Sequence, residues 1–223
     1  MKRYNLTAML CAAILISGQA LAEYKKGDLI VRVGGVAVDP NDDSNHLRLN
    51  STALPGTRVY VDTGYSVSIT GTWLFADHWG LEFLAAAPFK HDLDVRGLPD
   101  PVTGELLGRV RLGDIKHLPP TLSIQWYPVC IESWIQPYIG LGVNYTHFLS
   151  EHINSVAQSY FETVLDAKSR ARLKLKNSWG LAGEVGINIA FGRESRWQFN
   201  AAIWYLDIDT DATIRFFTEA HRK

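Results

Sequence analysis

Between Ser178 and Phe191 the chain reads SWGLAGEVGINIAF. One parity of this stretch carries large apolar side chains and the other carries small or polar ones: Trp179, Leu181, Val185, Ile187, Ile189 and Phe191 against Ser178, Gly180, Ala182, Glu184, Gly186, Asn188 and Ala190. Successive side chains of a β-strand point to opposite faces. The pattern is therefore typical of a strand with one face towards lipid and the other towards a polar lumen.

Similar alternation elsewhere predicts seven strands in total: 28–38, 65–76, 80–89, 118–127, 135–148, 174–191 and 197–217. The short connections 76–80, 128–134 and 192–196 alternate with the long connections 39–64, 90–117 and 149–173. Short periplasmic turns and long external loops produce this rhythm in outer-membrane barrels. Within the third long connection, residues 151–167 lack alternation and carry helix formers, so we expect a short helix there.

Aromatic residues give an independent indication of two membrane boundaries. Those flanking the short turns predict a periplasmic girdle: Trp73, Phe75, Trp79, Trp126, Tyr127, Trp134, Phe191, Trp197 and Phe199. Those at the opposite strand ends predict an outer girdle: Tyr65, Phe89, Tyr145, Trp179 and Phe216. The alternative is a soluble, lipocalin-like barrel with its apolar residues inside, but such a barrel does not need Trp at every short turn.

The start of the chain has the form of a cleaved secretory signal. Lys2 and Arg3 precede an apolar run, and Ala20-Leu21-Ala22 resembles a signal-peptidase site, so we predict removal of residues 1–22. Removal leaves 20 basic against 23 acidic residues in one predicted barrel domain, 23–223. This balance does not favour a nucleic-acid partner. No run of about 18 apolar residues follows, so a membrane-inserted chain has to be a closed barrel.

The inward parity predicts a mostly polar lumen. It contains Arg32, Ser68, Thr70, Thr72, Glu82, Gln125, Gln136, Asn144, Glu184, Asn188, Gln198 and Asn200. Arg32, Glu82 and Glu184 are candidates for a buried ionic plug, and a role of these charges in transport is the alternative.

A run of cations continues the parity of inward-facing Ser178. Lys168, Arg170, Arg172, Lys174 and Lys176 alternate with less polar residues. If the strand keeps its phase above the membrane, these cations line the outer mouth and attract anions or lipopolysaccharide phosphates. A solvated loop face is the alternative.

Several sequence motifs are candidates for metal-binding or catalytic sites and do not meet the requirements of such sites. Asp207-x-Asp209-x-Asp211 lacks the Gly and Glu of a calcium-binding EF-hand loop, because Ala212 and Thr218 hold those positions. The histidines show no metal-ligand spacing, so we predict no metal and no cofactor. His147 and Ser150 with an Asp of the last hairpin are a weak hydrolase alternative, and we predict no enzyme activity and no catalytic residues.

Six segments resemble the outer membrane protein W family, in matching order over nearly the whole mature chain. They are 84–89 (LAAAPF), 117–122 (HLPPTL), 125–127 (QWY), 137–146 (PYIGLGVNYT), 178–183 (SWGLAG) and 204–210 (WYLDIDT). The resemblance implies an all-β, antiparallel, up-and-down transmembrane barrel of eight strands in the outer membrane of a Gram-negative bacterium. It also implies a narrow, partly hydrophobic lumen associated with uptake of small apolar molecules.

The chain departs from the family pattern at its end. Family members close with an eighth strand whose terminal aromatic residue is read by the barrel-insertion machinery, whereas this sequence stops at 218–223 (TEAHRK), in the position of an external loop. About seven strands leave two edges facing lipid, which is costly. We therefore expect that the C-terminal strand is missing from this sequence.

The resemblance also guides the functional hypothesis. Apolar residues on the inward parity, Leu84 and Trp204 with Leu74 and Leu206, are predicted to form a hydrophobic collar for passive uptake of small hydrophobic molecules. Local filling, or a bulge that reverses the parity, is the alternative for these residues. At the level of function, the alternative is a closed structural barrel whose long loops bind lipopolysaccharide or external partners. The expected partners are outer-membrane lipid, lipopolysaccharide, small hydrophobic solutes and the insertion machinery.

Overall fold

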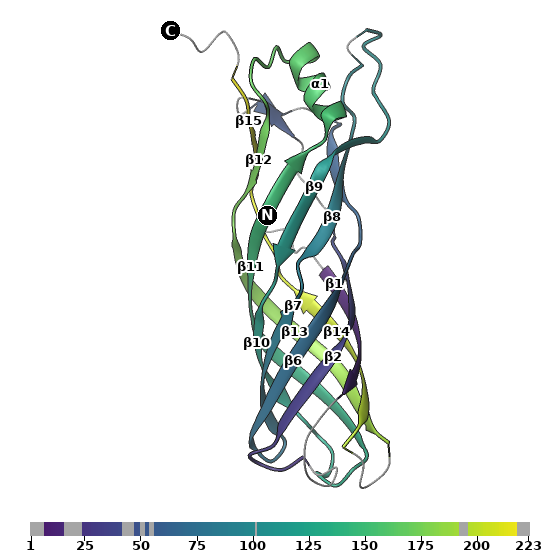
Figure 1. Cartoon of the computed structure of the whole chain (residues 1–223), viewed down its shortest axis with the longest axis vertical. Helices are drawn as coiled ribbons and strands as arrows, with labels where there is room; N and C mark the ends of the chain where they lie inside the picture. The colour runs from purple at the N-terminus through teal and green to yellow at the C-terminus, as the bar shows by residue number, and fades with distance from the viewer. Residues whose placement is uncertain are drawn as a thin grey trace.

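The computed structural model describes residues 7–15, 24–41, 47–49, 52–53, 56–100, 102–191 and 196–217. The predicted cleavage motif 20–22, most of the short connection 192–196 and the terminal segment 218–223 lie outside these residues. The described chain forms one tall barrel with the short turns at one end and helix α1 at the other (Figure 1). The half with the short turns is called the lower barrel, and the half with α1 the upper barrel.

The wall of the lower barrel is a closed antiparallel ring. Among the described residues, eight strands follow each other around it: β1 (Thr7–Leu15), β2 (Leu29–Asp39), β6 (Gly64–Ala76), β7 (Trp79–Ala86), β10 (Thr121–Trp126), β11 (Ile135–Ile153), β13 (Ser178–Ala190) and β14 (Gln198–Leu206). Pairing of β10 with β11 completes the ring. The seven strands after β1 lie where the alternation predicts them, and the antiparallel architecture is confirmed.

Strand β1 lies between β2 and β14, and it belongs to the predicted signal segment. Thr7 pairs with Leu206 of β14, and Ala8 pairs with Asp39 of β2. The backbone of 7–15 therefore joins β2 to β14 in the described wall. Cleavage after Ala22 is not tested by this arrangement and stays a prediction.

The upper barrel continues several strands of the lower barrel. It contains β5 (Arg58–Val61), β8 (Phe89–Arg96), β9 (Val110–Leu118), β12 (Arg172–Leu175), β15 (Ala212–Arg215) and the end of β11, with the small hairpin β3 (Arg48–Leu49) and β4 (Thr52–Ala53). Strands β5, β8, β9 and β11 pair in this order, and β12 pairs with β15. All three long connections predicted as loops are thus partly strands. Strand β5 pairs with β8, β8 and β9 pair as a hairpin, and β11 continues to Ile153.

Helix α1 (Ser155–Val164) confirms the helix expected within residues 151–167. Asn154 caps it, since its side chain accepts a hydrogen bond from the N–H of Val156 at 2.9 Å. Ala157 and Phe161 on one side of the helix are buried in the upper barrel. Within the described part of the chain, no helix is long and apolar enough to span a membrane.

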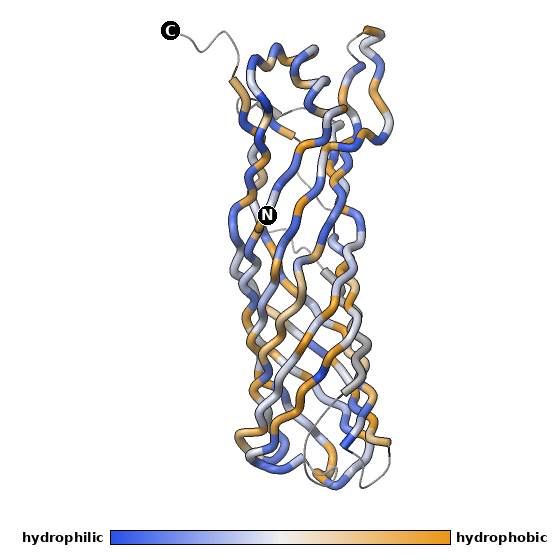
Figure 2. The backbone as a smooth tube through the Cα atoms, in the orientation of Figure 1, coloured by the Kyte–Doolittle hydropathy of each residue, from blue (hydrophilic) through white to orange (hydrophobic). Residues whose placement is uncertain are grey.

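Large apolar side chains face outward from the lower barrel. Hydropathy alternates along its strands (Figure 2), and the exposed apolar set includes Val67, Ile69, Phe83, Ile124, Ile139, Leu141, Val143, Leu181, Val185 and Ile203. A soluble barrel would bury these residues and expose the polar ones. The observed arrangement is the one expected for a barrel surrounded by lipid.

The two aromatic girdles are mostly as predicted, with three corrections. Phe216 packs against the buried cluster of the upper barrel, where its ring stacks on Phe161 with centroids 5.7 Å apart. Trp73, Trp79, Trp126, Trp134, Phe191, Trp197 and Phe199 are exposed near the short turns, and Tyr65 and Trp179 are exposed at the other end. Tyr127 and Phe89, in contrast, are buried inside the barrel. Tyr127 shares the inward parity of Gln125, and Phe89 follows the break at Pro88, where the parity of the strand reverses.

Candidate functional site

The polar residues predicted to face inward are buried in the lumen. All are at most 8% exposed: Arg32, Ser68, Thr70, Thr72, Glu82, Gln125, Gln136, Asn144, Glu184, Asn188, Gln198 and Asn200. Because polar groups removed from water require partners, their burial implies a hydrogen-bonded network across the lumen.

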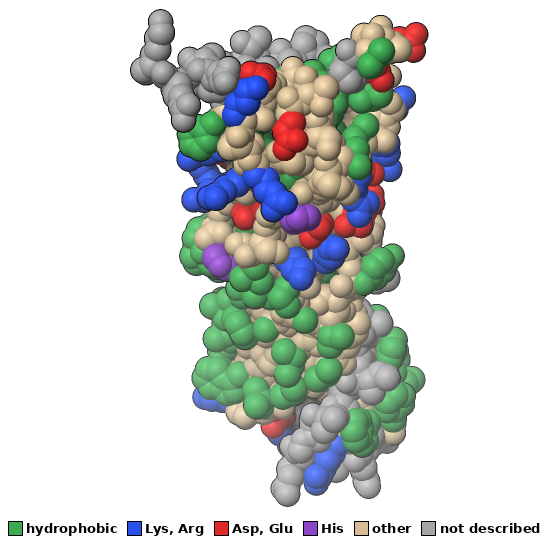
Figure 3. Space-filling view, turned by 45° about the horizontal axis from the view of Figure 1, so that its top comes forward, with side chains coloured by type: hydrophobic (Ala, Val, Ile, Leu, Met, Phe, Trp, Pro, Cys, Tyr) green, Lys and Arg blue, Asp and Glu red, His purple; other side chains and the backbone are tan. Residues whose placement is uncertain are grey.

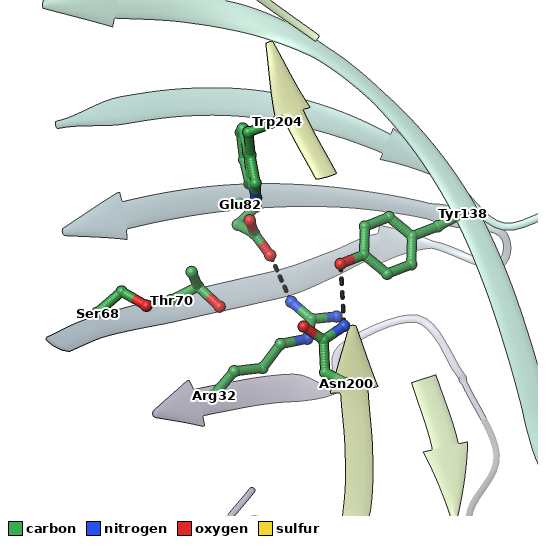
Figure 4. A pocket seen from close by; sticks show the side chains of 7 residues that line it. All are labelled: Arg32, Ser68, Thr70, Glu82, Tyr138, Asn200 and Trp204. Atoms are coloured by element: carbon green, nitrogen blue, oxygen red, sulfur yellow. Dashed lines mark hydrogen bonds and ion pairs between the residues drawn. The ribbon is translucent and has the colours of Figure 1, made fainter. Parts of the chain in front are cut away.

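Arg32 on β2 is the centre of this network (Figure 4). Its guanidinium forms an ion pair with Glu82 and donates hydrogen bonds to Thr72 Oγ1 at 2.6 Å, to Asn188 Oδ1 at 3.1 Å and to the Tyr127 hydroxyl at 3.2 Å. Four strands and the turn after β10 are thereby joined across the interior. A buried ion pair with this many additional hydrogen bonds can offset the cost of removing both charges from water.

Glu184 is linked to the network through neutral partners. Its Oε1 accepts hydrogen bonds from Ser123 Oγ at 2.7 Å and from Gln125 Nε2 at 3.0 Å. Among the described residues, the carboxylate within ion-pair distance of Arg32 is that of Glu82. The predicted plug thus contains a direct pair, Arg32 with Glu82, and a third acidic residue, Glu184, that is linked to it through Gln125.

Three tyrosines that were not predicted to face inward complete the network. Tyr127 donates a hydrogen bond to Gln125 Oε1 at 2.6 Å, and its ring centroid lies 5.1 Å from that of Tyr24 and 5.4 Å from that of Tyr138. The Tyr138 hydroxyl accepts a hydrogen bond from Asn200 at 3.0 Å. The inward parity of Tyr127 and Tyr138 was a usable signal, but Tyr24 precedes the first predicted strand and carried none.

The predicted apolar collar is divided between two levels. Leu74, Leu84, Trp204 and Leu206 are all buried, at most 2% exposed, and belong to one hydrophobic cluster. Leu74 of β6 is opposite Gly80 of β7. Leu84 lies four residues beyond Gly80 on β7, about 13 Å along the strand. Leu84, Trp204 and Leu206 therefore lie in the outer half of the lumen, and Leu74 lies near the short turn between β6 and β7.

A small cavity lies within the polar network, between residues that the structure describes. This cavity, beside Arg32, is lined by Ser68, Thr70 and Glu82 on one side and by Tyr138, Asn200 and Trp204 on the other (Figure 4). It has room for about one water molecule. Arg32, Glu82 and Tyr127 are at most 2% exposed, so the polar network fills the axis of the lower barrel at their level.

The predicted basic lining of the outer mouth is wrong in its orientation. Arg172, Lys174 and Lys176 are exposed, whereas Ala171, Leu173 and Leu175 between them are buried in the upper barrel, and Lys168 and Arg170 are exposed as well. The chain leaves the strand conformation at Lys176 and Asn177, and the parity reverses before Ser178. This orientation is the more favourable one, because it buries the leucines on the inner side and leaves the charged side chains hydrated outside.

A pair of buried histidines lies where the upper barrel begins. His91 and His117 stack with centroids 4.8 Å apart, and their Nε2 atoms are 2.8 Å apart. His91 Nδ1 lies 2.7 Å from the carbonyl oxygen of Asp62, so this nitrogen carries a proton and donates. Burial lowers the pKa of His91, and burial together with the neighbouring His91 lowers the pKa of His117 to about 3.

The hydrolase alternative finds no support at His147. Its Nδ1 lies 3.1 Å from the side-chain oxygen of Asn177, and its ring stacks against Tyr145 with centroids 6.4 Å apart. Among the described residues, no group of three or more His, Cys, Asp or Glu side chains is arranged to hold a metal ion.

Comparison with known proteins decides the family. Residues 25–223 match the OmpW family. The chain belongs to the OmpW family. It is 34% identical over 205 residues to outer membrane protein W of Vibrio cholerae, covering 92% of this chain and 85% of that protein. It is 33% identical over 215 residues to outer membrane protein W of Escherichia coli, covering 96% and 88%.

The fold of this OmpW-family chain is similar to that of a solved relative. The crystal structure of the outer membrane protein OprG from Pseudomonas aeruginosa superimposes with a TM-score of 0.76 at 40% sequence identity, covering 88% of this chain and 85% of OprG. The resemblance inferred from the six sequence segments is thus confirmed. The chain is an outer-membrane β-barrel of the kind found in Gram-negative bacteria, in a family of non-enzymatic barrels.

Proposed function

We propose that this OmpW-family barrel provides passive uptake of small apolar molecules through the outer half of its lumen. The supporting observation is the burial of Leu84, Trp204 and Leu206 in a lumen whose other inward positions are largely polar. Apolar side chains at these positions offer an apolar solute a surface that it prefers to water. No chemical step and no energy source are required.

The solute's exit is expected to be lateral, because the polar network around Arg32 fills the axis at its level. Pairing of β7 with β10 ends at Leu84 opposite Thr121, and pairing of β8 with β9 begins at Phe89 opposite His117. Prolines at 88, 119 and 120 occupy the interruption. Proline cannot donate a ladder hydrogen bond, so this part of the wall is less tightly joined than its surroundings. It lies directly beside Leu84.

The test compares three leucine or tryptophan substitutions in reconstituted vesicles. Leu84→Ser and Trp204→Ser are expected to slow uptake of an apolar solute, because each places a hydroxyl on the proposed path. Leu74→Ser is the matched control, since Leu74 is equally buried but lies near the periplasmic turns. Heat-dependent mobility in detergent gels would verify folding. Uptake and ion conductance unchanged in both outer variants would overturn the proposal.

The alternative function is a closed barrel that acts through its external surface. The continuous hydrogen-bonded network across the lumen and the small size of its cavity favour this alternative. The two functions differ in one measurement. If the barrel is closed to solutes, cells that lack the protein take up apolar solutes as fast as cells that contain it.

A further inference from the structure

Two pairs of cations face each other across neighbouring strands of the upper barrel. Lys90 of β8 is opposite Lys116 of β9, and Arg172 of β12 is opposite Arg215 of β15. All of these side chains are exposed. Like charges directly opposite each other on a sheet are destabilising, so both pairs are unfavourable unless an anion lies between them.

Protein carboxylates neutralise little of this charge. Lys90 lies 3.9 Å from Asp114, at the limit of an ion pair. Within the described part of the chain, Lys116, Arg172 and Arg215 have no ion pair.

Neighbouring acidic groups already have partners. Arg111 forms an ion pair with Asp92 and lies 3.8 Å from Asp94. Glu151 accepts a hydrogen bond from the N–H of Leu175 at 3.0 Å, and Asp211 lies 2.9 Å from Lys176. Apart from the 3.9 Å contact of Lys90 with Asp114, no carboxylate of the described residues lies within ion-pair distance of the two cation pairs, so both retain a net positive charge.

The two pairs belong to one face of the upper barrel. Lys116 of β9 is opposite Ser150 of β11, and the hydrogen bond from Leu175 to Glu151 joins β11 to β12. Lys174, also exposed, lies on β12 between this junction and Arg172. The set Lys90, Lys116, Arg172, Lys174 and Arg215 is called the basic face. Figure 3 shows Lys and Arg side chains gathered directly above the zone of hydrophobic side chains.

The height of the basic face matches that of phosphorylated lipid headgroups. Tyr145 and Trp179 mark the outer boundary of the apolar zone, with ring centroids 4.6 Å apart. Ser150, opposite Lys116, is five residues beyond Tyr145 on β11. This spacing is about 17 Å along the strand, or roughly 13 Å above the boundary for a strand tilted by about 40°.

We propose that the basic face binds phosphate groups of lipopolysaccharide in the outer leaflet, with one phosphate held between the members of each opposed pair. Charge-assisted hydrogen bonds from two cations to one phosphate replace the repulsion within each pair by attraction. This binding does not depend on solute uptake, because the face lies outside the barrel wall.

The experiment uses the full chain in detergent with purified lipopolysaccharide as the probe. The double variant Lys116→Gln/Arg215→Gln removes one cation from each pair, and Lys26→Gln is the control. Lys26 is exposed at the opposite end, where its N–H donates to Asp77 at 2.9 Å. Affinity and unfolding temperature would be measured with native and with dephosphorylated lipopolysaccharide.

The double variant is expected to bind native lipopolysaccharide at least about tenfold more weakly, while Lys26→Gln binds as the unchanged protein does. Without lipopolysaccharide the double variant should unfold at the same or a higher temperature, because repulsion is relieved. Weaker binding together with an unchanged or higher unfolding temperature would show that the double variant has lost the binding site and not the fold. Undiminished binding in the double variant, an equal loss in Lys26→Gln, or equal binding of the dephosphorylated form would overturn the proposal.

Discussion

The lower and upper barrels bury opposite kinds of side chain, although some of the same strands run through both. On β11, Leu141 in the lower barrel is 77% exposed, whereas Asn144 is fully buried. In the upper barrel, Ile115 and Leu173 are buried, and the neighbouring Lys116 and Lys174 are exposed. Lipid surrounds one half and water the other, so the more favourable face for an apolar side chain reverses between them.

The reversal is achieved in two ways. Some strands change parity at a break: between β7 and β8 at Ala87 and Pro88, and within β11 at the irregularity between Phe148 and Ser150. Strands β9 and β10 instead keep one parity and change residue type, with Ile115 inside above and Gln125 inside below. The parity of a strand therefore predicts which of its side chains face the interior only as far as the next break in that strand.

Closure of the ring should matter in the lower barrel far more than in the upper one. Without residues 1–22, the strands β2 and β14 lose their pairing with β1. Each backbone group left unpaired in lipid costs several kcal/mol, whereas water satisfies the open edges of the upper sheets. We expect residues 23–223, when no other strand pairs with β2 and β14, not to show the heat-dependent gel mobility of a folded barrel. Folding equal to that of the full chain would show that the ring closes without β1.

Removal of one partner of the buried ion pair should have the next largest effect. Glu82→Ala leaves the Arg32 guanidinium without its carboxylate in the lower lumen. Urea unfolding in lipid should show a loss of about 3–5 kcal/mol. The double replacement Arg32→Met/Glu82→Leu should recover most of this loss, because no unpaired charge remains. A double variant as unstable as Glu82→Ala would contradict this explanation.

A pair of identical substitutions on β11 tests the boundary between the two halves. Leu141 and Leu149 are both exposed, at 77% and 46%, below and above Tyr145. Leu141→Arg should reduce the free energy of unfolding in a bilayer by about 2–4 kcal/mol. Leu149→Arg should change it little, since its environment is water. Equal losses in the two variants would place the boundary elsewhere.

Acid should weaken the upper barrel through the histidine pair. The pKa of His117 is lowered to about 3 by burial and by His91, whereas an unfolded histidine titrates near pH 6.5. The stabilisation from keeping His117 neutral is complete above about pH 6.5 and is lost as the pH falls towards 3. At pH 5 the loss is about 2 kcal/mol.

Urea unfolding between pH 7.5 and pH 5 would measure this dependence. His117→Phe should reduce it, because a phenyl ring keeps the stacking with Phe89 and cannot be protonated. The exposed His152→Phe is the control and should leave the dependence unchanged. A dependence that persists in His117→Phe would assign it to other groups.

The fold of the lower barrel was predictable because lipid imposes a strict alternation on each strand. Every inward polar residue named from parity is buried, as are Leu84 and Trp204. Within that half, Tyr127 was misplaced because its position beside a short turn suggested a girdle. Its parity carried the correct information.

The upper barrel was less predictable because its strands follow breaks that reset the parity. The cations at 168–176 were extrapolated from Ser178 across the break at Lys176 and Asn177, and this reversed their orientation. The apolar alternation expected of a lipid-facing strand does not detect the hairpin of β8 and β9, in which charged residues such as Asp92 and Arg111 are prominent. The position of β1 was not predictable, because its sequence has the features of a signal segment.

Passage of apolar solutes through a barrel that does not conduct ions is the central property to test. The uptake of an apolar solute and the ion conductance should be measured on the same vesicles containing the full chain. The account predicts solute uptake above that of empty vesicles with little added conductance, because the network around Arg32 fills the axis at its level. High conductance without solute uptake would contradict it, since the lumen would then be an aqueous pore.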